Sequence, residues 1–263
     1  MIAPALAGAG SGRRRWLFWS FVVLMVALTV VFAGLGKWQI DRLAWKESLL
    51  AEVQQRLHLP PVALPPVAEW VAFDPETYQY RPVTLTGHFV SGQAVRVFVG
   101  LSDAKGQYSG PGYWIMTPFA LDGGGTVFVD RGFVPDNLSA TYANDNTAPA
   151  GTITLSGIAM PSEAPGPFTP GADAVKRIEW VRNIDRMAKL ASAALQPFAP
   201  IYVDLPAGPA GALPQGGETT IDFPNNHLGY ALTWFGFAIL TPIMLAVWVL
   251  RQRRKRSGPP PDL

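Results

Sequence analysis

The stretch from Asn225 to Leu250, NNHLGYALTWFGFAILTPIMLAVWVL, restricts most strongly what this chain can fold into. Between Leu228 and Leu250 the only ionisable side chain is that of Tyr230. At a rise of about 1.5 Å per residue, a helix of this length extends roughly 30 Å, which is enough to cross the hydrocarbon core of a bilayer. We therefore predict a transmembrane helix over residues 228–250.

A second apolar run, Trp16–Gly36, reads WLFWSFVVLMVALTVVFAGLG and contains no charged residue. Three arginines at 13–15 stand before this run, and RQRRKR follows the later run at 251–256. Basic clusters are enriched on the cytoplasmic flanks of membrane spans. We therefore predict two antiparallel spans, with both termini in the cytoplasm and the residues between the spans on the outer side.

The first run has an alternative interpretation as a cleaved signal peptide. It follows basic residues, and Val31-Phe32-Ala33 offers small residues near its end where a peptidase could cut. The apolar stretch is, however, longer than the ~7–15 residues that are usual in a signal peptide. We therefore favour an uncleaved membrane anchor.

The predicted order of segments places one large outer domain between the two spans. Residues 1–12 show no periodicity and are expected to be disordered, and PPVALPPV at 60–67 breaks any helix and is expected to be an extended linker. The arginines lie too near the start for a mitochondrial presequence, which favours a bacterial cytoplasmic membrane. The segments are a cytoplasmic tail at 1–15, transmembrane helix 1 at 16–36, an extramembrane helix and Pro-rich linker at 37–68, a periplasmic domain at 69–224, transmembrane helix 2 at 228–250 and a cytoplasmic basic tail at 251–263.

The outer domain carries the alternation of apolar and polar residues that is typical of half-buried strands. In residues 80–89 the positions of Val83 and Leu85 face one side, and those of Thr84 and Thr86 face the other. Asp185 is expected to cap a short helix that runs through residue 195. We predict a membrane protein with two transmembrane α-helices flanking a β-rich, antiparallel, barrel-like α+β domain. Its strands are expected at 80–89 with a hairpin partner at 94–100, at 113–120 and 126–134 joined by LDGGG, and at 152–160, 178–183 and 201–205.

The sequence offers few residues for catalysis. The absence of cysteine excludes disulfides, thiolate metal sites and iron–sulfur clusters, and there is no nucleophile elbow, P-loop or dinucleotide fingerprint. The carboxylates are scattered without a pair suited to acid–base work, and the adjacent Asp130 and Arg131 are interpreted as an ion pair of the fold, with a partner contact as the alternative. His58 and His88 are expected to be solvated. We therefore expect a protein that is not an enzyme.

The distribution of charge argues against nucleic acid as a partner. The formal net charge is only +2. It results from two basic ends around an acidic middle, since the residues from Lys37 to His227 include 18 acidic and 13 basic side chains.

His227 stands at the outer start of the second span, where two interpretations remain open. Neutral imidazole is a common ligand of haem iron, so His227 could bind a lipophilic haem between the helices. Alternatively, it is a polar interface residue that is hydrogen-bonded to Asn225, Asn226 or lipid headgroups. Tyr230 and Trp234 lie one and two turns deeper, where they could line a porphyrin or simply pack the two helices.

Seven segments between the two spans, in this order, identify the chain as similar to a known family. Each alone is a weak signal, but the set resembles the surfeit-locus-one family of cytochrome c oxidase assembly proteins. The matching segments are LGKWQIDRLAWK at 35–46, YQYRPVTLTGHF at 78–89, GYWIMTPF at 112–119, VFVDRGFVP at 127–135, LSGIAMPSE at 155–163, IYVD at 201–204 and NNHLGYALTWFG at 225–236.

The resemblance implies an assembly factor that binds haem a and helps to insert it into the core subunit of cytochrome c oxidase. By this analogy His227 is the axial ligand of the haem iron, with Tyr230, Trp234 and Trp38 beside it, and Arg42 could pair with a haem propionate. The implied partners are the membrane, the oxidase core subunit and, as a second candidate, the machinery of haem a synthesis. The match also raises the interest of a further set of residues, whose alternative role is domain packing and anchoring: Trp38, Gln39, Arg42, Trp45, Tyr80, Arg81, Arg131 and Gly132.

Two other functions are compatible with the same residues. The spans could grip the apo core subunit as a scaffold that binds no haem. The outer domain could instead be an enzyme acting on haem or lipid, which the missing nucleophile and cofactor loop disfavour.

Overall fold

The computed structural model describes residues 9–142, 147–219 and 225–256, with only the backbone described at 9–11 and 255–256. The chain divides into two compact units: Met1–Ala51 together with Asp222–Leu263, and Glu52–Ile221. Most of the predicted disordered tail and the last residues of the basic tail lie outside the described part. Residues 9–12 of that tail are helical. Once the neighbouring apolar run is helical, adding further residues to its end is easier than starting a new helix.

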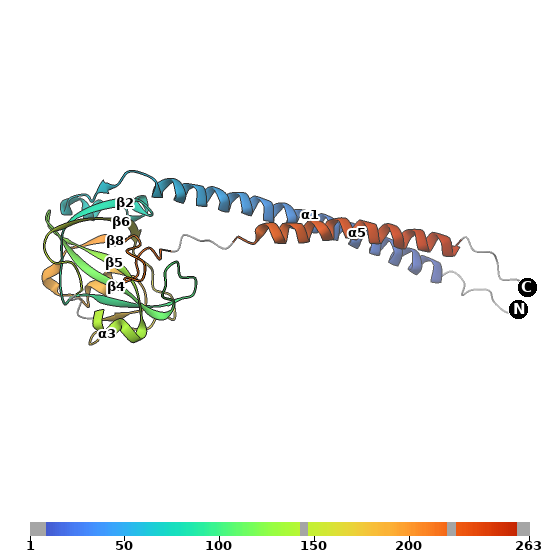
Figure 1. The fold of residues 1–263 in the computed structure, drawn as a ribbon. Helices are drawn as coiled ribbons and strands as arrows, with labels where there is room; N and C mark the ends of the chain where they lie inside the picture. The colour runs from blue at the N-terminus through green and yellow to red at the C-terminus, as the bar shows by residue number, and fades with distance from the viewer. Residues whose placement is uncertain (1–8, 143–146, 220–224, 257–263) are drawn as a thin grey trace, which may run out of the picture. The chain divides into compact units, whose positions relative to one another are not determined.

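The first unit contains two helices, α1 (Ala9–Leu57) and α5 (His227–Arg256), which lie side by side in Figure 1. Both are long and apolar enough to cross a membrane. Aromatic rings of the two helices pair along their length. The ring centroids of Phe21 and Trp248 are 4.6 Å apart, and those of Phe32 and Trp234 are 5.8 Å apart. Since early residues of one helix contact late residues of the other, the two apolar helices are antiparallel, as predicted.

A glycine sets how closely these helices approach each other. A Cβ atom added to Gly36 would lie only 2.7 Å from the ring of Phe235. Small residues at a helix crossing let the two backbones come together. Gly36 therefore fixes the register of the pair and brings the next turn of α1 opposite the start of α5.

The second unit is built on an eight-stranded sheet whose strand order is β1-β2-β6-β8-β5-β4-β3-β7 among the described residues. The long strand β4 also pairs with β2, which closes the central strands into a barrel (Figure 1). The strands are β1 (Val62–Ala63), β2 (Pro82–Phe89), β3 (Val95–Leu101), β4 (Gly110–Leu121), β5 (Thr126–Pro135), β6 (Ile153–Pro161), β7 (Ile178–Glu179) and β8 (Phe198–Asp204).

Short helices connect and cover these strands. The 3-10 segments are η1 (Val67–Ala72), η2 (Asp136–Leu138) and η3 (Ala193–Leu195), and the α-helical turns are α2 (Pro75–Tyr78), α3 (Ser139–Tyr142) and α4 (Ile184–Ala188). The main core cluster includes Val83 and Leu85 of β2, whereas Thr86 and His88 of that strand are exposed. The predicted alternation of β2 is therefore confirmed.

A second apolar cluster lies under α4. The predicted helix over 185–195 is shorter than expected, and its cap is Asn183 rather than Asp185, because the Asn183 side chain accepts a hydrogen bond of 3.0 Å from the backbone N–H of Arg186. The strand predicted at 178–183 is reduced to the two residues of β7 for the same reason: the chain turns at Asn183 to start the helix.

Two features of the predicted topology are wrong. The strands β2 and β3 do not form a hairpin, because β4 is long enough to pair with β3 along its first half and with β2 at its end. The sheet is not purely antiparallel either, since β1–β2, β3–β7 and β5–β8 are parallel pairs. The β4–β5 hairpin across LDGGG is confirmed.

The Pro-rich segment is part of the outer domain rather than a free linker. Its residues Val62 and Ala63 form β1 against β2, and Leu64 and Val67 pack against the main core cluster. The indole N–H of Trp70 donates a hydrogen bond of 2.9 Å to the carbonyl of Pro65, which holds the segment on the domain.

Candidate functional site

His227 is the first residue of α5, and its side chain contacts α1. The Nδ1 atom of His227 lies 2.7 Å from Oε1 of Gln39. Gln39 is only 8% exposed, although it lies three residues beyond the apolar run of α1. Both residues belong to the same compact unit, so the sequence's candidate ligand has a partner on the other helix.

This hydrogen bond defines what the imidazole can do. With the amide oxygen of Gln39 as the acceptor, a neutral His227 ring donates from Nδ1 and keeps its lone pair on Nε2. Metal-ligating histidines commonly use one ring nitrogen for iron or zinc and donate the other N–H to an oxygen acceptor. The chemistry of this donor set therefore fits an axial ligand of haem iron.

The alternative hydrogen bonds from His227 to Asn225 or Asn226 are not formed among the described residues, where its ring has Gln39 as partner. Asn225 contributes a buried side-chain oxygen, Oδ1, that has no hydrogen-bond partner within the described ranges.

The structure does not bring Trp38 and Arg42 to His227. Trp38 is 56% exposed, and the guanidinium of Arg42 stacks over the ring of Trp45, 3.9 Å from its centroid. In a helix, residues 38 and 45 share a face, and that face is turned away from the one that carries Gly36 and Gln39. These residues of α1 form a separate exposed surface.

The two predicted residues of α5 also differ from each other. Trp234 stacks on Phe32 of α1 and so serves helix packing, the alternative role that the sequence left open. Tyr230 is 57% exposed, one turn from His227. Of the predicted binding residues, Tyr230 is therefore the one that leaves its side chain accessible near the candidate ligand.

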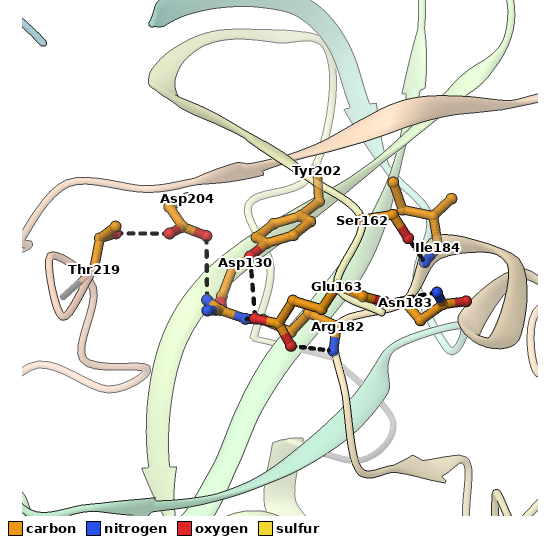
Figure 2. Close-up of polar contacts among 9 residues, drawn as sticks. All are labelled: Asp130, Ser162, Glu163, Arg182, Asn183, Ile184, Tyr202, Asp204 and Thr219. Atoms are coloured by element: carbon orange, nitrogen blue, oxygen red, sulfur yellow. Dashed lines mark hydrogen bonds and ion pairs between the residues drawn. The ribbon is translucent and has the colours of Figure 1, made fainter. Parts of the chain in front are cut away.

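A buried charge cluster in the outer domain was not predicted. Asp130 at the end of the apolar part of β5 lies opposite Asp204 at the end of β8 (Figure 2). Arg182 lies between them: its Nη1 is 3.3 Å from Asp130 Oδ2 and 3.7 Å from Asp204 Oδ1, and its Nε donates to Glu163 Oε1 at 2.8 Å. Three carboxylates thus surround one guanidinium.

The cluster joins distant segments of the chain. The Asp130 and Asp204 side chains are almost fully buried, and Asp204 Oδ2 accepts a hydrogen bond of 2.6 Å from Thr219. Burial and the neighbouring Asp204 raise the pKa of Asp130 to about 7, while Arg182 opposes the shift. Burial also raises the pKa of Asp204. These contacts bind the ends of the strands together, which is a structural role.

One expectation about charges is wrong. Carboxylates that are scattered in sequence meet in space around Arg182, and the repeated pattern of three apolar residues before an aspartate, VFVD and IYVD, was the available signal. Asp130 pairs with Arg182 and not with Arg131, because adjacent strand residues point to opposite faces. Arg131 instead donates to the carbonyl of Thr147 at 2.9 Å.

Neither His58 nor His88 has a side-chain partner like the one that Gln39 provides for His227 among the described residues. His88 is exposed, and the ring of exposed His58 contacts the carbonyl of Gln54. Across the described ranges, no three side chains of histidine, cysteine, aspartate or glutamate gather where they could hold a metal ion.

A comparison with known protein families decides to which family the chain belongs. A model of the SURF1 family matches residues 26–239. This chain belongs to the SURF1 family. It is 32% identical to a SURF1-like protein of Monosiga brevicollis over 99% of both chains. It is 30% identical to Surfeit locus protein 1 of Rattus norvegicus over 86% of this chain and 73% of that protein, and 30% identical to Surfeit locus protein 1 of Homo sapiens over 85% and 75%.

The SURF1 match covers α1 from residue 26 onward, the whole outer barrel and α5 up to residue 239. Gln39 and His227 lie inside the matched range, 188 positions apart. The Arg182 cluster lies inside it as well. The family assignment therefore applies to the part of the chain on which the site is built.

Proposed function

We propose that this SURF1-family protein is an assembly factor of haem–copper cytochrome c oxidase that carries haem a to the core subunit. A role in oxidase assembly is what the SURF1 family implies. The observation that supports the haem proposal is the hydrogen bond of 2.7 Å between Nδ1 of His227 and the buried amide of Gln39, which leaves Nε2 as the ring nitrogen that we propose for iron.

Each part of the site has a distinct task in this proposal. The bound haem supplies an iron atom with an open coordination position for an imidazole nitrogen. His227 would coordinate that iron, and Tyr230 lies one turn away with an exposed side chain. A single protein ligand suits a carrier, because release to the oxidase requires one bond to be broken. No catalytic residue is needed for this exchange, so we propose a chaperone and not an enzyme.

The visible spectrum tests the proposal directly. We expect the detergent-purified chain from cells that make haem a to show a haem band, and we expect His227→Ala to lose it while keeping the same helical content and elution volume. His88→Ala is a matched control on the exposed face of β2 and should keep the band. Equal haem loading of His227→Ala and the unmodified chain would contradict the proposal.

A scaffold that grips the apo core subunit without haem is the second candidate. It is favoured by the exposed surface of Trp38 and Trp45 on α1, which does not face α5. If neither the unmodified chain nor the variant carries haem, but the chain still copurifies with the apo core subunit, the scaffold function replaces haem delivery.

We further propose a bacterial cytoplasmic membrane, with both termini in the cytoplasm and residues 52–221 in the periplasm. The antiparallel apolar helices and the basic residues beyond each of them support this orientation. A reporter fused after Leu263 that is active only in the cytoplasm is the expected result. Activity of that fusion only in the periplasm would contradict the orientation.

A further inference from the structure

Gln39 is unusual among the first polar residues after the apolar run of α1. Its neighbours Trp38 and Ile40 are exposed, as is usual at a membrane boundary, whereas Gln39 is buried against α5. A buried amide is costly unless it is hydrogen-bonded. The bond of 2.7 Å between Oε1 and the ring of His227 satisfies its oxygen.

The geometry of the helix pair places this amide with little freedom. One turn earlier, Gly36 packs against the ring of Phe235, and a side chain at Gly36 would push the helices apart. Further along, Phe32 contacts Trp234 and Phe237. The register of the two helices is thus set by contacts that do not involve His227, and Gln39 is held at the correct height to meet it.

We infer that Gln39 is a positioning residue for the haem ligand: it holds His227 in the tautomer and orientation that present Nε2 to iron. The inference rests on the proposed function and adds to it a residue that touches no haem atom. Without the acceptor, the ring can rotate, and the proton can move to Nε2, where it blocks coordination.

The choice of a neutral amide has a further consequence. Oxygen acceptors behind a metal-bound histidine strengthen its bond to the metal, and a carboxylate does so more than an amide because its charge attracts the N–H proton. A glutamine therefore orients His227 without making the bond to iron as strong as a glutamate would. This is the behaviour expected of a protein that must release its haem.

The test compares the full-length chain with Gln39→Leu and Gln39→Glu in detergent, using haem a as the titrant. Loss of such an acceptor typically weakens binding by about 10–100-fold, and this is the expected change in Kd for Gln39→Leu. We expect Gln39→Glu to bind at least as tightly as the unmodified chain and to release haem more slowly to apomyoglobin. Gln54→Leu removes an exposed glutamine from the same helix and should change neither quantity.

A second measurement needs no haem. Long-range ¹H–¹⁵N correlation spectra of the ¹⁵N-histidine-labelled apoprotein report which ring nitrogen of His227 carries the proton. We expect the Nδ1–H tautomer in the unmodified chain and in Gln39→Glu, and a shift of population toward the Nε2–H tautomer in Gln39→Leu.

The possible outcomes distinguish a failure of the positioning role of Gln39 from a failure of the proposed haem-carrier function. If His227→Ala loses haem but Gln39→Leu binds it with unchanged Kd and unchanged tautomer, the positioning role is wrong and the proposed function stands. If His227→Ala binds haem normally, the proposed function fails, and the positioning of an iron ligand fails with it. An Nε2–H tautomer in the unmodified apoprotein would also overturn the inference.

Discussion

Arg182→Met is expected to lower the free energy of unfolding of the outer domain by about 3–5 kcal/mol at pH 8. The substitution leaves the buried Asp130 and Asp204 carboxylates, which are 3% and 4% exposed, without the cation that lies between them. Removing one partner of a buried ion pair is costly because the remaining charge has neither water nor a counter-ion. Denaturant unfolding of the detergent-solubilised chain, followed by near-ultraviolet circular dichroism, measures the loss.

The same loss should shrink at low pH. Because burial raises the pKa of Asp130 to about 7 from an ordinary value of 3.8, the folded state binds a proton that the unfolded state releases. The stabilisation from this proton is complete below about pH 4 and is lost as the pH rises through about 7. The unmodified domain should therefore be more stable at pH 5.5 than at pH 8, and Arg182→Met should show a steeper dependence.

Two companion variants make this result specific. Glu52→Gln breaks the exposed ion pair with Arg56 and should change the stability by no more than about 1 kcal/mol. Adding Asp130→Asn to Arg182→Met should recover part of the loss, because one of the two uncompensated buried charges disappears. A loss for Arg182→Met as small as that for Glu52→Gln, and independent of pH, would show that the cluster does not stabilise the domain.

Gly132→Ala is expected to destabilise the outer domain by about 4 kcal/mol, which combines backbone strain with overpacking. Gly132 has a φ of +123°, and an added Cβ would lie 2.2 Å from the carbonyl carbon of Gln215. The neighbouring Phe133 exchanges two backbone hydrogen bonds of 2.8 Å with Gln215, so the chains cannot separate without losing them. The midpoint of thermal unfolding should fall accordingly.

The matched control for Gly132→Ala is Gly100→Ala. Gly100 lies in β3, and an added Cβ there would meet no atom within 4 Å. We expect its unfolding midpoint to stay close to that of the unmodified chain. If the two alanine variants unfold alike, the close approach at Gly132 does not constrain the fold. A normal midpoint for Gly132→Ala would also reopen a functional role for Gly132.

The helices and most strands could be predicted because buried positions are occupied by apolar residues at regular intervals in the sequence. An uncharged run such as 228–250 and the alternation of Val83 and Leu85 with Thr84 and Thr86 both report the surroundings of each side chain directly. The pairing of strands is different, since it depends on partners far along the chain. The β2–β3 hairpin failed because the length of β4, and not the loop between β2 and β3, decides the order.

The candidate site could be predicted only in part for a similar reason. His227 was visible because a histidine at the start of an apolar span is rare. The family resemblance included Gln39 among the matching residues, but nothing in the sequence linked it to His227, since an amide just beyond a span looks like any interface residue. Its role follows from the helix register that Gly36 sets. Arg182 likewise shows its importance only when Asp130 and Asp204 are known to be neighbours in the sheet.

The separation of Gln39 and His227 in the chain has a consequence for synthesis. They are 188 positions apart in the chain, and the residues between them include the entire outer barrel. A ribosome therefore completes the first helix and the barrel before the ligand itself is made. Under the proposed function, a chain that terminates early holds no haem at this site, so that only finished and fully inserted molecules can draw on the cell's supply of haem.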